Sequence, residues 1–352
     1  MTLPRSAVVG VLLVASAAAV EGATRCVNPR GAPPCVGTIQ EAVNASGAGD
    51  VVTVFPGTYF ESVIVPPGRD GLQISGANAL RVTVDPDLPN LGTGFTIRSA
   101  GVTIERLTIR NGRAGVLVEA DDAILQRLRI LGIREDVGAD GYGIALQPNV
   151  TGARILANEM RSIAFAGVQL FGGNEGTVVG SNTFSGMPNA VIGIISNTRV
   201  PSNNVQFLSN RIQLTTGGVD LRGENVTVAG NSLERVGGIV VSGGNPKIDR
   251  NRAINVAVLA AIICDPCDAG TVVGNSATGV ETGVEVIANG DGLRVASNRF
   301  VDTAEAIMTP GRSLPPNTSG RSSAPDARIA CLAAMRQTRS TGRSADGCAT
   351  CF

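Results

Sequence analysis

Residues 231–251 read NSLERVGGIVVSGGNPKIDRN, and this stretch contains one complete structural repeat of the 352-residue chain. An asparagine opens the stretch at Asn231, and the next repeat opens at Asn251. Between them lie three short apolar pieces, at 232–233, 238–241 and 247–249, separated by turn residues such as the Gly-Gly-Asn-Pro corner. Each piece is too short for a helix and is bounded by turns, which is typical of brief β-strands.

The same phrase, an apolar residue two or three positions before an asparagine, returns every 20 to 28 residues. A period in this range indicates a repeat architecture in which each unit packs on its neighbours. Two earlier phrases have leucine at the asparagine position, Leu107 and Leu128. A second recurring phrase, Gly-apolar-x-apolar, occupies 115–118, 143–146, 167–170, 218–221 and 283–286. The repeated asparagines are Asn158, Asn182, Asn210, Asn231, Asn251, Asn275 and Asn298.

Three strands that recur in the same order every ~23 residues must each lie beside their counterparts in the next repeat. The sequence therefore predicts an all-β solenoid, a single-stranded parallel β-helix of about ten coils. Asparagine suits the tight corner because it tolerates left-handed backbone angles, and its amide can bond the asparagines above and below in a buried ladder. One inward column, with neighbours about 4.8 Å apart, is predicted to contain Val116, Ile144, Val168, Val219, Ile239 and Val284.

The two ends of the chain differ from the repeats. Residues 1–23 have a basic start, an apolar core and a small-residue cleavage pattern, so they are predicted to be a signal peptide. The segment Thr38-Ile39-Gln40-Glu41 is a capping box that opens a predicted capping helix at 38–46. The β-helix is predicted to span 24–310, followed by a linker and cysteine-containing tail at 311–352. We expect a secreted or periplasmic protein without membrane insertion after signal cleavage.

Composition excludes several kinds of chemistry. The 29 basic and 29 acidic residues give zero formal net charge, so no nucleic-acid partner is expected. The chain has no histidine, which removes the commonest general base and metal ligand. Its seven cysteines fit an oxidising compartment. Cys26 and Cys35 flank a short loop and are predicted to form a disulfide. For Cys264 and Cys267 a disulfide is favoured over a redox motif or half of a zinc site, both of which lack the required context.

The stretch TIQEAVNASGAGDVVTVFPGTYFESVIV at 38–65 closely resembles the capping helix and first coil of secreted right-handed β-helix proteins in the pectin-lyase-like superfamily. Together with the asparagine repeats, the resemblance covers about residues 26–310. It implies a right-handed coil and a polysaccharide partner lying along one lateral groove. It does not imply one activity, because this fold hosts lyases, hydrolases, esterases, epimerases and adhesins. The catalytic patterns of polygalacturonases, pectinesterases and alginate epimerases are incomplete or absent here.

Two repeats are enlarged at the same corner, by DPDLPNLGT at 85–93 and by REDVGAD at 134–140. Loops at one corner would form the side of a groove next to the Gly-apolar-x-apolar strand. The richest cluster of chemistry-bearing residues there gives the catalytic candidates Arg134, Asp136, Asp140 and Tyr142, with Glu135 beside them. Two such carboxylates could act as acid and base in glycoside cleavage; Arg134 or Tyr142 could instead assist proton abstraction, with Ca²⁺ held by Asp136 and Asp140. The outward, substrate-binding candidates are Arg98, Glu119, Gln147, Gln169, Phe171, Asp220 and Arg222.

Three functions remain open from the sequence. The favoured one is an exported, non-catalytic β-helix that binds a polysaccharide or a cell-surface glycan. The alternative is a polysaccharide lyase or glycoside hydrolase that uses the 134–142 loop. A purely structural or adhesive solenoid, joined between chains through its cysteine-containing tail, is the third. Charged surface loops are usually solvated, and an Arg98–Glu119 pair would be an ordinary surface ion pair.

Overall fold

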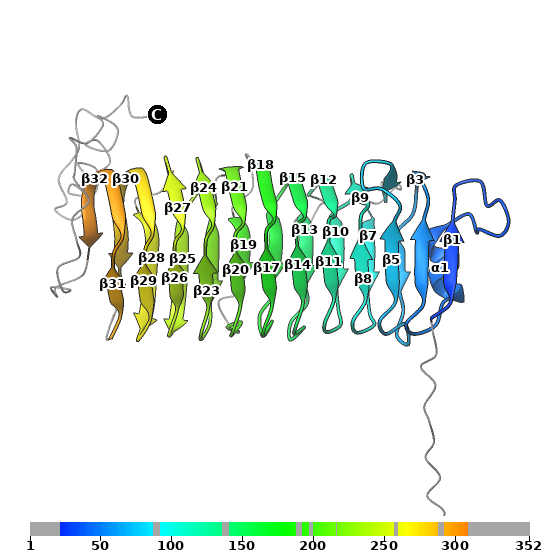
Figure 1. The fold of residues 1–352 in the computed structure, drawn as a ribbon, viewed down its shortest axis with the longest axis horizontal. Helices are drawn as coiled ribbons and strands as arrows, with labels where there is room; N and C mark the ends of the chain where they lie inside the picture. Colours follow the sequence, from blue (N-terminus) through cyan, green and yellow to red (C-terminus); the bar gives the residue numbers. More distant parts are fainter. Residues whose placement is uncertain are drawn as a thin grey trace, which may run out of the picture.

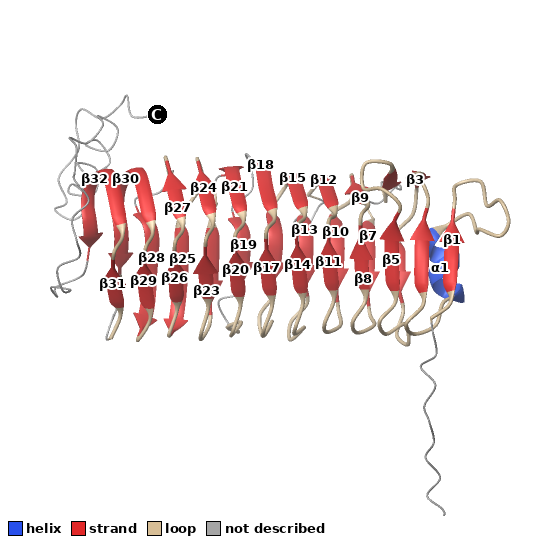
Figure 2. Ribbon diagram, in the orientation of Figure 1, coloured by secondary structure: helices blue, strands red, loops and turns tan. Residues whose placement is uncertain are grey.

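The protein is a long solenoid in which strands stack along a single axis (Figure 1). The computed structural model describes residues 22–86, 92–135, 141–187, 192–196, 200–215, 217–256, 260–287 and 292–308. The predicted signal peptide up to residue 21 and the predicted linker and tail at 311–352 lie outside these residues. Nearly every described element is a strand, and the only helix is at the N-terminal end (Figure 2). The described helix, at seven residues, is far too short to span a membrane.

The strands form three parallel ladders, with one strand of each ladder in every coil. We call them ladders A, B and C, in the order in which the chain passes through them. Ladder A is a sheet of 12 strands, and the solenoid has about eleven coils. Its members are β1 (Thr24–Val27), β2 (Val51–Val54), β5 (Gln73–Gly76), β8 (Thr103–Glu105), β11 (Ile124–Gln126), β14 (Arg154–Leu156), β17 (Val178–Gly180), β20 (Gln206–Leu208), β23 (Thr227–Ala229), β26 (Lys247–Asp249), β29 (Thr271–Val273) and β31 (Arg294–Ala296).

Ladders B and C together form a sheet of 20 strands, because the last two strands run through both. These two are β30 (Ser276–Val286) and β32 (Arg299–Met308). Ladder B also contains β3 (Gly57–Tyr59), β6 (Val82–Val84), β9 (Thr108–Arg110), β12 (Arg129–Ile133), β15 (Glu159–Ile163), β18 (Thr183–Met187), β21 (Arg211–Thr215), β24 (Ser232–Glu234) and β27 (Arg252–Ile254). Ladder C also contains β4 (Val63–Val65), β7 (Thr93–Ile97), β10 (Ala114–Val118), β13 (Tyr142–Leu146), β16 (Ala166–Leu170), β19 (Ile192–Ser196), β22 (Val219–Arg222), β25 (Ile239–Gly244) and β28 (Ala260–Asp268).

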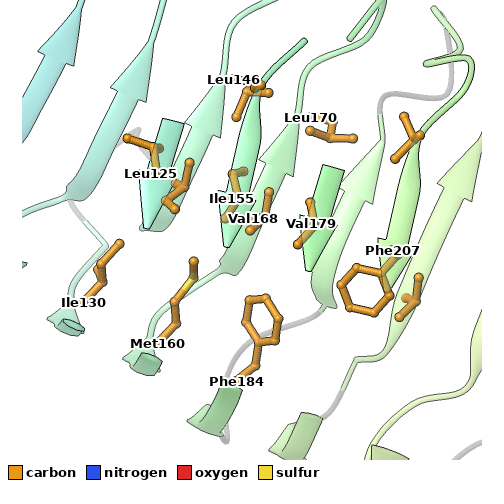
Figure 3. Close-up of a cluster of buried hydrophobic side chains, with 14 of the residues drawn as sticks. Leu125, Ile130, Leu146, Ile155, Met160, Val168, Leu170, Val179, Phe184 and Phe207 are labelled. Carbon is orange, nitrogen blue, oxygen red and sulfur yellow. The ribbon is translucent and has the colours of Figure 1, made fainter. Parts of the chain in front are cut away.

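The core is a set of aliphatic columns, one inside each ladder. The predicted ladder C column is confirmed: Val116 pairs with Ile144, Ile144 with Val168, and Val219 with Ile239, and all of these side chains are buried. Ile262 lies between Ile239 and Val284 in the same column, a member that the sequence reading missed. Figure 3 shows the neighbouring columns, in which Leu125, Ile155, Val179 and Phe207 are in register on ladder A. The columns explain why strands such as β22 and β24 alternate buried and partly exposed residues.

The recurring glycine of the Gly-apolar-x-apolar phrase marks the closest approach between neighbouring coils. A Cβ atom at Gly143 would lie 2.5 Å from the Gly167 carbonyl oxygen and 3.0 Å from the Met160 sulfur. A Cβ atom at Gly115 would meet the Gly143 carbonyl oxygen at 2.5 Å. Any larger residue would push adjacent coils apart, which is why the phrase begins with glycine.

The asparagine ladder is confirmed, and it is continuous from Asn158 to Asn298. In each coil the Asn Oδ1 accepts from both the backbone N–H and the Nδ2 of the preceding Asn, as when Asn231 Oδ1 accepts from Asn210 at 2.7 and 3.1 Å. The Nδ2 also donates to a ladder A carbonyl of the preceding coil, for Asn231 the Phe207 oxygen at 2.9 Å. These side chains are at most 4% exposed. The ladder therefore satisfies buried polar groups at a corner where no strand pairing is available.

The left-handed corner residue is not the asparagine, so that part of the prediction was wrong. The positive φ angle belongs to the residue before it: 55° at Ala157, 56° at Ser181, 55° at Ser209 and 67° at Gly230. Because the asparagine must point its amide into the stack, the preceding residue makes the turn instead. The side chain of this preceding residue faces solvent. Many residue types therefore occupy the position, despite the cost of a left-handed backbone conformation.

Helix α1 (Ile39–Ala45) closes the N-terminal end of the stack, as predicted. The Thr38 side chain accepts from the Glu41 N–H, and the Glu41 carboxylate accepts from the Thr38 N–H at 3.2 Å, which completes the capping box. The buried face of the helix carries Ile39, Ala42 and Val43. This face contacts β1, β2 and β4, so it covers the first coil that would otherwise end in open strand edges.

Candidate functional site

Both enlarged corners lie where the sequence placed them, between a ladder B strand and a ladder C strand. The 85–93 segment joins β6 to β7, and the 134–140 segment joins β12 to β13. Residues 87–91 and 136–140 are outside the described part of the chain, and these include the catalytic candidates Asp136 and Asp140. Arg134 directly follows β12 and Tyr142 opens β13, so these two candidates lie at opposite ends of one corner. Arg134 and Glu135 are exposed.

Tyr142 is the centre of an aromatic cluster beside ladder C. Its ring centroid lies 5.6 Å from that of Phe165 and 5.6 Å from that of Phe171, and both contacts are edge-to-face. Such geometry is favourable between rings because the positive edge of one meets the negative face of another. All three side chains are partly exposed. The cluster therefore joins two consecutive coils and presents aromatic surface to solvent.

Four predicted substrate-binding residues form a row just beyond the ends of consecutive ladder C strands. Arg98, Glu119, Gln147 and Phe171 each donate their backbone N–H to the preceding coil, to Val65, Ile97, Val118 and Leu146 respectively. Neighbouring members are thus one strand spacing apart, about 4.8 Å. The row runs directly into the aromatic cluster, because Phe171 belongs to both.

Arg98 and Glu119 in this row form the ion pair that the sequence suggested. Arg98 Nε lies 2.7 Å from Glu119 Oε2, and the two side chains are 47% and 30% exposed. An exposed pair of this kind contributes little stability, under about 1 kcal/mol. Its effect is to fix the two side chains side by side at the start of the row.

Gln169 and Asp220 occupy a second outward row on ladder C. Gln169 pairs with Ile195 of β19, and Ile195 pairs with Asp220 of β22. Asp220 is bonded to Arg222 on its own strand, with Nε to Oδ1 at 3.3 Å and Nη2 to Oδ2 at 3.5 Å. Gln169 is only 4% exposed, and its Nε2 donates to the Leu170 carbonyl at 3.0 Å. Gln169 is therefore covered, although its position on the strand is an outward one, and its side chain is not exposed to a ligand.

Phe165 is the member of the site that the sequence reading missed. It lies two positions before Gly167, and Tyr142 lies one position before Gly143. Aligning the repeats on these glycines would have placed both rings at the start of adjacent ladder C strands. The signal was therefore present in the repeat alignment.

The cysteine predictions have different outcomes. Cys26 and Cys35 form the predicted disulfide. Cys264 and Cys267 are free thiols in this structure, so the second predicted disulfide is not formed. A register shift opposite Val241 and Gly243 lets both side chains of β28 face the core, where both are fully buried. A hydrogen bond with Cys267 and burial raise the pKa of the Cys264 thiol, which disfavours the thiolate.

No group of three or more His, Cys, Asp or Glu side chains is placed to hold a metal ion within the described residues. The Ca²⁺ site considered from the sequence depends on Asp136 and Asp140, which lie outside them. It therefore stays a prediction.

Comparisons with known proteins agree with this architecture. Residues 142–302 match the family model described as right handed beta helix region. No curated protein sequence matches the chain.

Several solved structures share the fold at low sequence identity. A mannuronic acid specific polysaccharide lyase from the human gut microbiota has a TM-score of 0.60 and 14% identity, covering 84% of this chain and 79% of the lyase. The catalytic unit of an α-1,3-glucanase from Streptomyces thermodiastaticus has a TM-score of 0.54 and 15% identity, covering 82% of this chain and 64% of that unit. The A-module of a mannuronan C-5 epimerase from Azotobacter vinelandii has a TM-score of 0.50 and 16% identity, and the match covers 82% of this chain and 94% of the A-module. With its three parallel ladders, asparagine stack and N-terminal capping helix, the chain has the right-handed parallel β-helix fold of these structures.

Proposed function

We propose that this protein is an exported β-helix that binds an extended polysaccharide along the outer face of ladder C. The observation that carries the proposal is the aromatic cluster of Tyr142, Phe165 and Phe171 beside a row of polar side chains. Aromatic rings offer flat apolar surface that packs against sugar rings, while a few placed polar groups fix orientation. The polar groups here are the Arg98–Glu119 pair, Gln147 and the Asp220–Arg222 pair.

The arrangement of carboxylates favours binding over hydrolysis. Glycoside hydrolysis needs two carboxyl groups on either side of the scissile bond. In the two rows described above, Glu119 and Asp220 are each bonded to an arginine. Each of these carboxylates is therefore engaged in an ion pair on this face, where it can orient a bound chain.

The alternative is a polysaccharide lyase or glycoside hydrolase acting at the same face. It is supported by the similar solved structures, which are a lyase, a glucanase and an epimerase. It would use Asp136, Asp140, Tyr142 and Arg134, with Ca²⁺ held by the two aspartates. The predicted signal peptide and the disulfide between Cys26 and Cys35 fit a secreted or periplasmic location for either function.

Binding of a panel of oligosaccharides, by calorimetry on the purified chain, tests the proposal. The panel contains mannuronate, galacturonate and α-1,3-glucan oligomers. Phe171→Ala is expected to weaken binding by about tenfold or more, since burying a phenylalanine side chain against a ligand is worth about 1.5–3 kcal/mol. Phe60→Ala is the matched control, because Phe60 is 66% exposed and lies near the N-terminal cap.

Equal binding by the Phe171→Ala variant, the Phe60→Ala variant and the unmodified protein would overturn the assignment to ladder C. Assays for new reducing ends and for unsaturated products decide between binding and catalysis. If the protein turns over a polysaccharide and the activity is lost in Asp136→Asn or Asp140→Asn, the protein is an enzyme that uses these residues. Loss of the activity on chelation would assign a role to Ca²⁺.

A further inference from the structure

A row of exposed arginines lies on the outer face of ladder B in the C-terminal coils, away from the candidate site. Strand pairing places Arg211, Ser232, Arg252, Ser276 and Arg299 at the same position of five successive coils. The three arginines are exposed and the two serines between them are partly buried. With a spacing of about 4.8 Å between strands, the guanidinium groups recur about every 10 Å. We call these three residues the arginine row.

The arginine row carries unneutralised positive charge, in contrast to earlier coils of the same ladder. At the same position, Arg129 is followed in the next coil by Glu159, and Nε lies 2.8 Å from Oε2. Glu159 also contacts Arg161 at 3.5 Å. None of Arg211, Arg252 and Arg299 makes an ion pair with any residue that the structure describes. Where an acid stands in the earlier coil, the later coils have serine.

The carboxylate nearest in sequence on this face does not change that balance. Glu234 lies two residues beyond Ser232 on β24, and its Oε2 accepts from Gln213 Nε2 at 2.8 Å. It is thus bonded along ladder B within its own row and leaves the arginine row in place. Since the whole chain has zero formal net charge, the row is a local feature and not a reflection of a basic protein.

We infer that the arginine row binds a linear acidic polysaccharide that carries carboxylate or sulfate groups at regular intervals. A guanidinium group presents a planar fork of N–H donors that matches the two oxygens of such an anion. Regular spacing along a rigid β-helix favours an extended chain with charge repeated along it, because each anion can then meet one arginine without bending. This surface is separate from the aromatic cluster, which lies beside ladder C, and the inference does not depend on the function proposed there.

Nucleic acid fits the same face less well. Proteins that bind single strands combine positive charge with aromatic side chains on which bases stack. On β21, β24 and β27 the outward residues are Arg211, Gln213, Ser232, Glu234, Arg252 and Ile254, and none is aromatic. The face offers charge without a stacking surface.

The test compares two triple variants that change the net charge by the same amount. Arg211→Ser, Arg252→Ser and Arg299→Ser together remove the arginine row. The control combines Arg154→Ser, Lys247→Ser and Arg294→Ser, which are exposed basic residues of ladder A without a described ion pair. Strand pairing places Arg154 four coils from Lys247 and Lys247 two coils from Arg294, so the control residues are unevenly spaced and only two of them share the spacing of the arginine row.

Binding of polygalacturonate oligomers and of heparin is measured by calorimetry at low and physiological salt, with neutral dextran as a reference. We expect the arginine-row variant to bind the acidic glycan about tenfold or more weakly, with a shallower salt dependence, and the control to bind within about twofold of the unmodified protein. Equal losses in both variants, or no loss in either, would overturn the inference. So would an unmodified protein that binds single-stranded DNA or anionic vesicles but neither acidic glycan. The arginine-row variant should bind neutral α-1,3-glucan oligomers as the unmodified protein does, so failure of this inference is distinguished from failure of the function proposed at ladder C.

Discussion

The N-terminal and C-terminal coils make the same corner with different chemistry. In the earlier coils the corner position is Leu107 or Leu128, and both side chains are buried. In the later coils it is an asparagine bonded to its neighbours in the stack. The backbone is the same in both regions, since the preceding residue has a φ of 56° at Arg106, 53° at Arg127 and 55° at Ala157. The coil therefore does not require asparagine, and a buried apolar side chain satisfies the same corner.

The two regions meet at Asn158. The Leu128 backbone N–H donates to Asn158 Oδ1 at 2.9 Å, so the last leucine coil still uses the first asparagine. From there onward each corner has an amide that bonds both the coil before it and the coil after it. The difference teaches that the leucine side chains contribute packing, while the asparagine side chains contribute hydrogen bonds to the neighbouring coils.

Removing one amide from the middle of the stack should have the largest effect. Asn231→Ala removes the acceptor of the Asn210 N–H and one acceptor of Asn210 Nδ2, and it removes the donor to the Phe207 carbonyl and one of the two donors to Asn251 Oδ1. We expect a loss of about 3–5 kcal/mol in the free energy of unfolding, because unsatisfied buried polar groups cost about 1–3 kcal/mol each. Urea denaturation measures it.

Asn225→Gly is the matched control for this change. Asn225 belongs to a second stack in which its Nδ2 donates to Asn204 Oδ1 at 3.2 Å, but that stack is exposed. Water can replace its bonds, so we expect a cost under about 1 kcal/mol. Equal costs at the two sites would show that burial of the ladder is not what makes it stabilising.

Shortening the leucine corner should cost less and for a different reason. Leu128→Ala creates a cavity between coils, and Leu128 is 1% exposed. We expect a loss of about 2–4 kcal/mol, typical of a buried leucine. Leu131→Ala, at a partly exposed position of β12, is the control and should cost much less. A loss as small at Leu128 as at Leu131 would contradict the packing account.

The N-terminal coils also contain a tyrosine hydrogen bond whose contribution to stability should decrease at alkaline pH. Tyr59 Oη donates to the Phe55 carbonyl at 2.8 Å, and burial, with a smaller effect of Glu61, raises the pKa of Tyr59 to about 12. A phenol whose pKa is raised on folding contributes stability that is fully present below its ordinary pKa of about 10. That contribution is lost as pH rises toward 12.

We therefore expect the stability difference between the unmodified protein and Tyr59→Phe to shrink from pH 8 to pH 11. Chemical denaturation at the two pH values measures it. A difference that stays constant across this range would show that the Tyr59 hydroxyl does not titrate with unfolding.

The smallest effect is expected at the left-handed residue that both regions share. Ala157→Gly removes the cost of a left-handed alanine, about 1 kcal/mol, but adds the entropy cost of glycine. We expect a change within about 1 kcal/mol, and a similar change for Arg127→Gly in the leucine region. Thermal denaturation of both variants tests whether the corner backbone is equivalent. A large loss at only one of them would show that the two corners differ.

Much of the fold was predictable because its physical causes repeat. The three-strand coil, the ladder C column, the capping box and the asparagine ladder each leave the same mark in successive repeats. The left-handed residue was assigned to the asparagine because residue preference favours it there. The structure shows that side-chain bonding determines the asparagine position, and the turn passes to a neighbour such as Ser181 or Ala157.

The candidate site was only partly predictable. Phe171 is predictable from its outward position and Tyr142 from the enlarged corner before its strand, but their contact depends on side-chain direction across two coils. The burial of Gln169 could not be inferred either, because strand alternation indicates which face a residue is on and not what covers it. The failure of the Cys264–Cys267 pairing has the same origin, since a register shift in β28 has no sequence repeat to reveal it.

Native-state hydrogen exchange of the asparagine backbone amides, resolved by NMR, tests the central claim most directly. The Asn231 N–H donates to Asn251 Oδ1 at 3.0 Å, and it has no other acceptor among its described bonds. In Asn251→Ala we expect the Asn231 amide to lose most of its protection, while the Leu233 amide in the adjoining strand keeps its own. If the Asn231 amide exchanges as slowly in Asn251→Ala as in the unmodified protein, the amide ladder does not hold the C-terminal coils together.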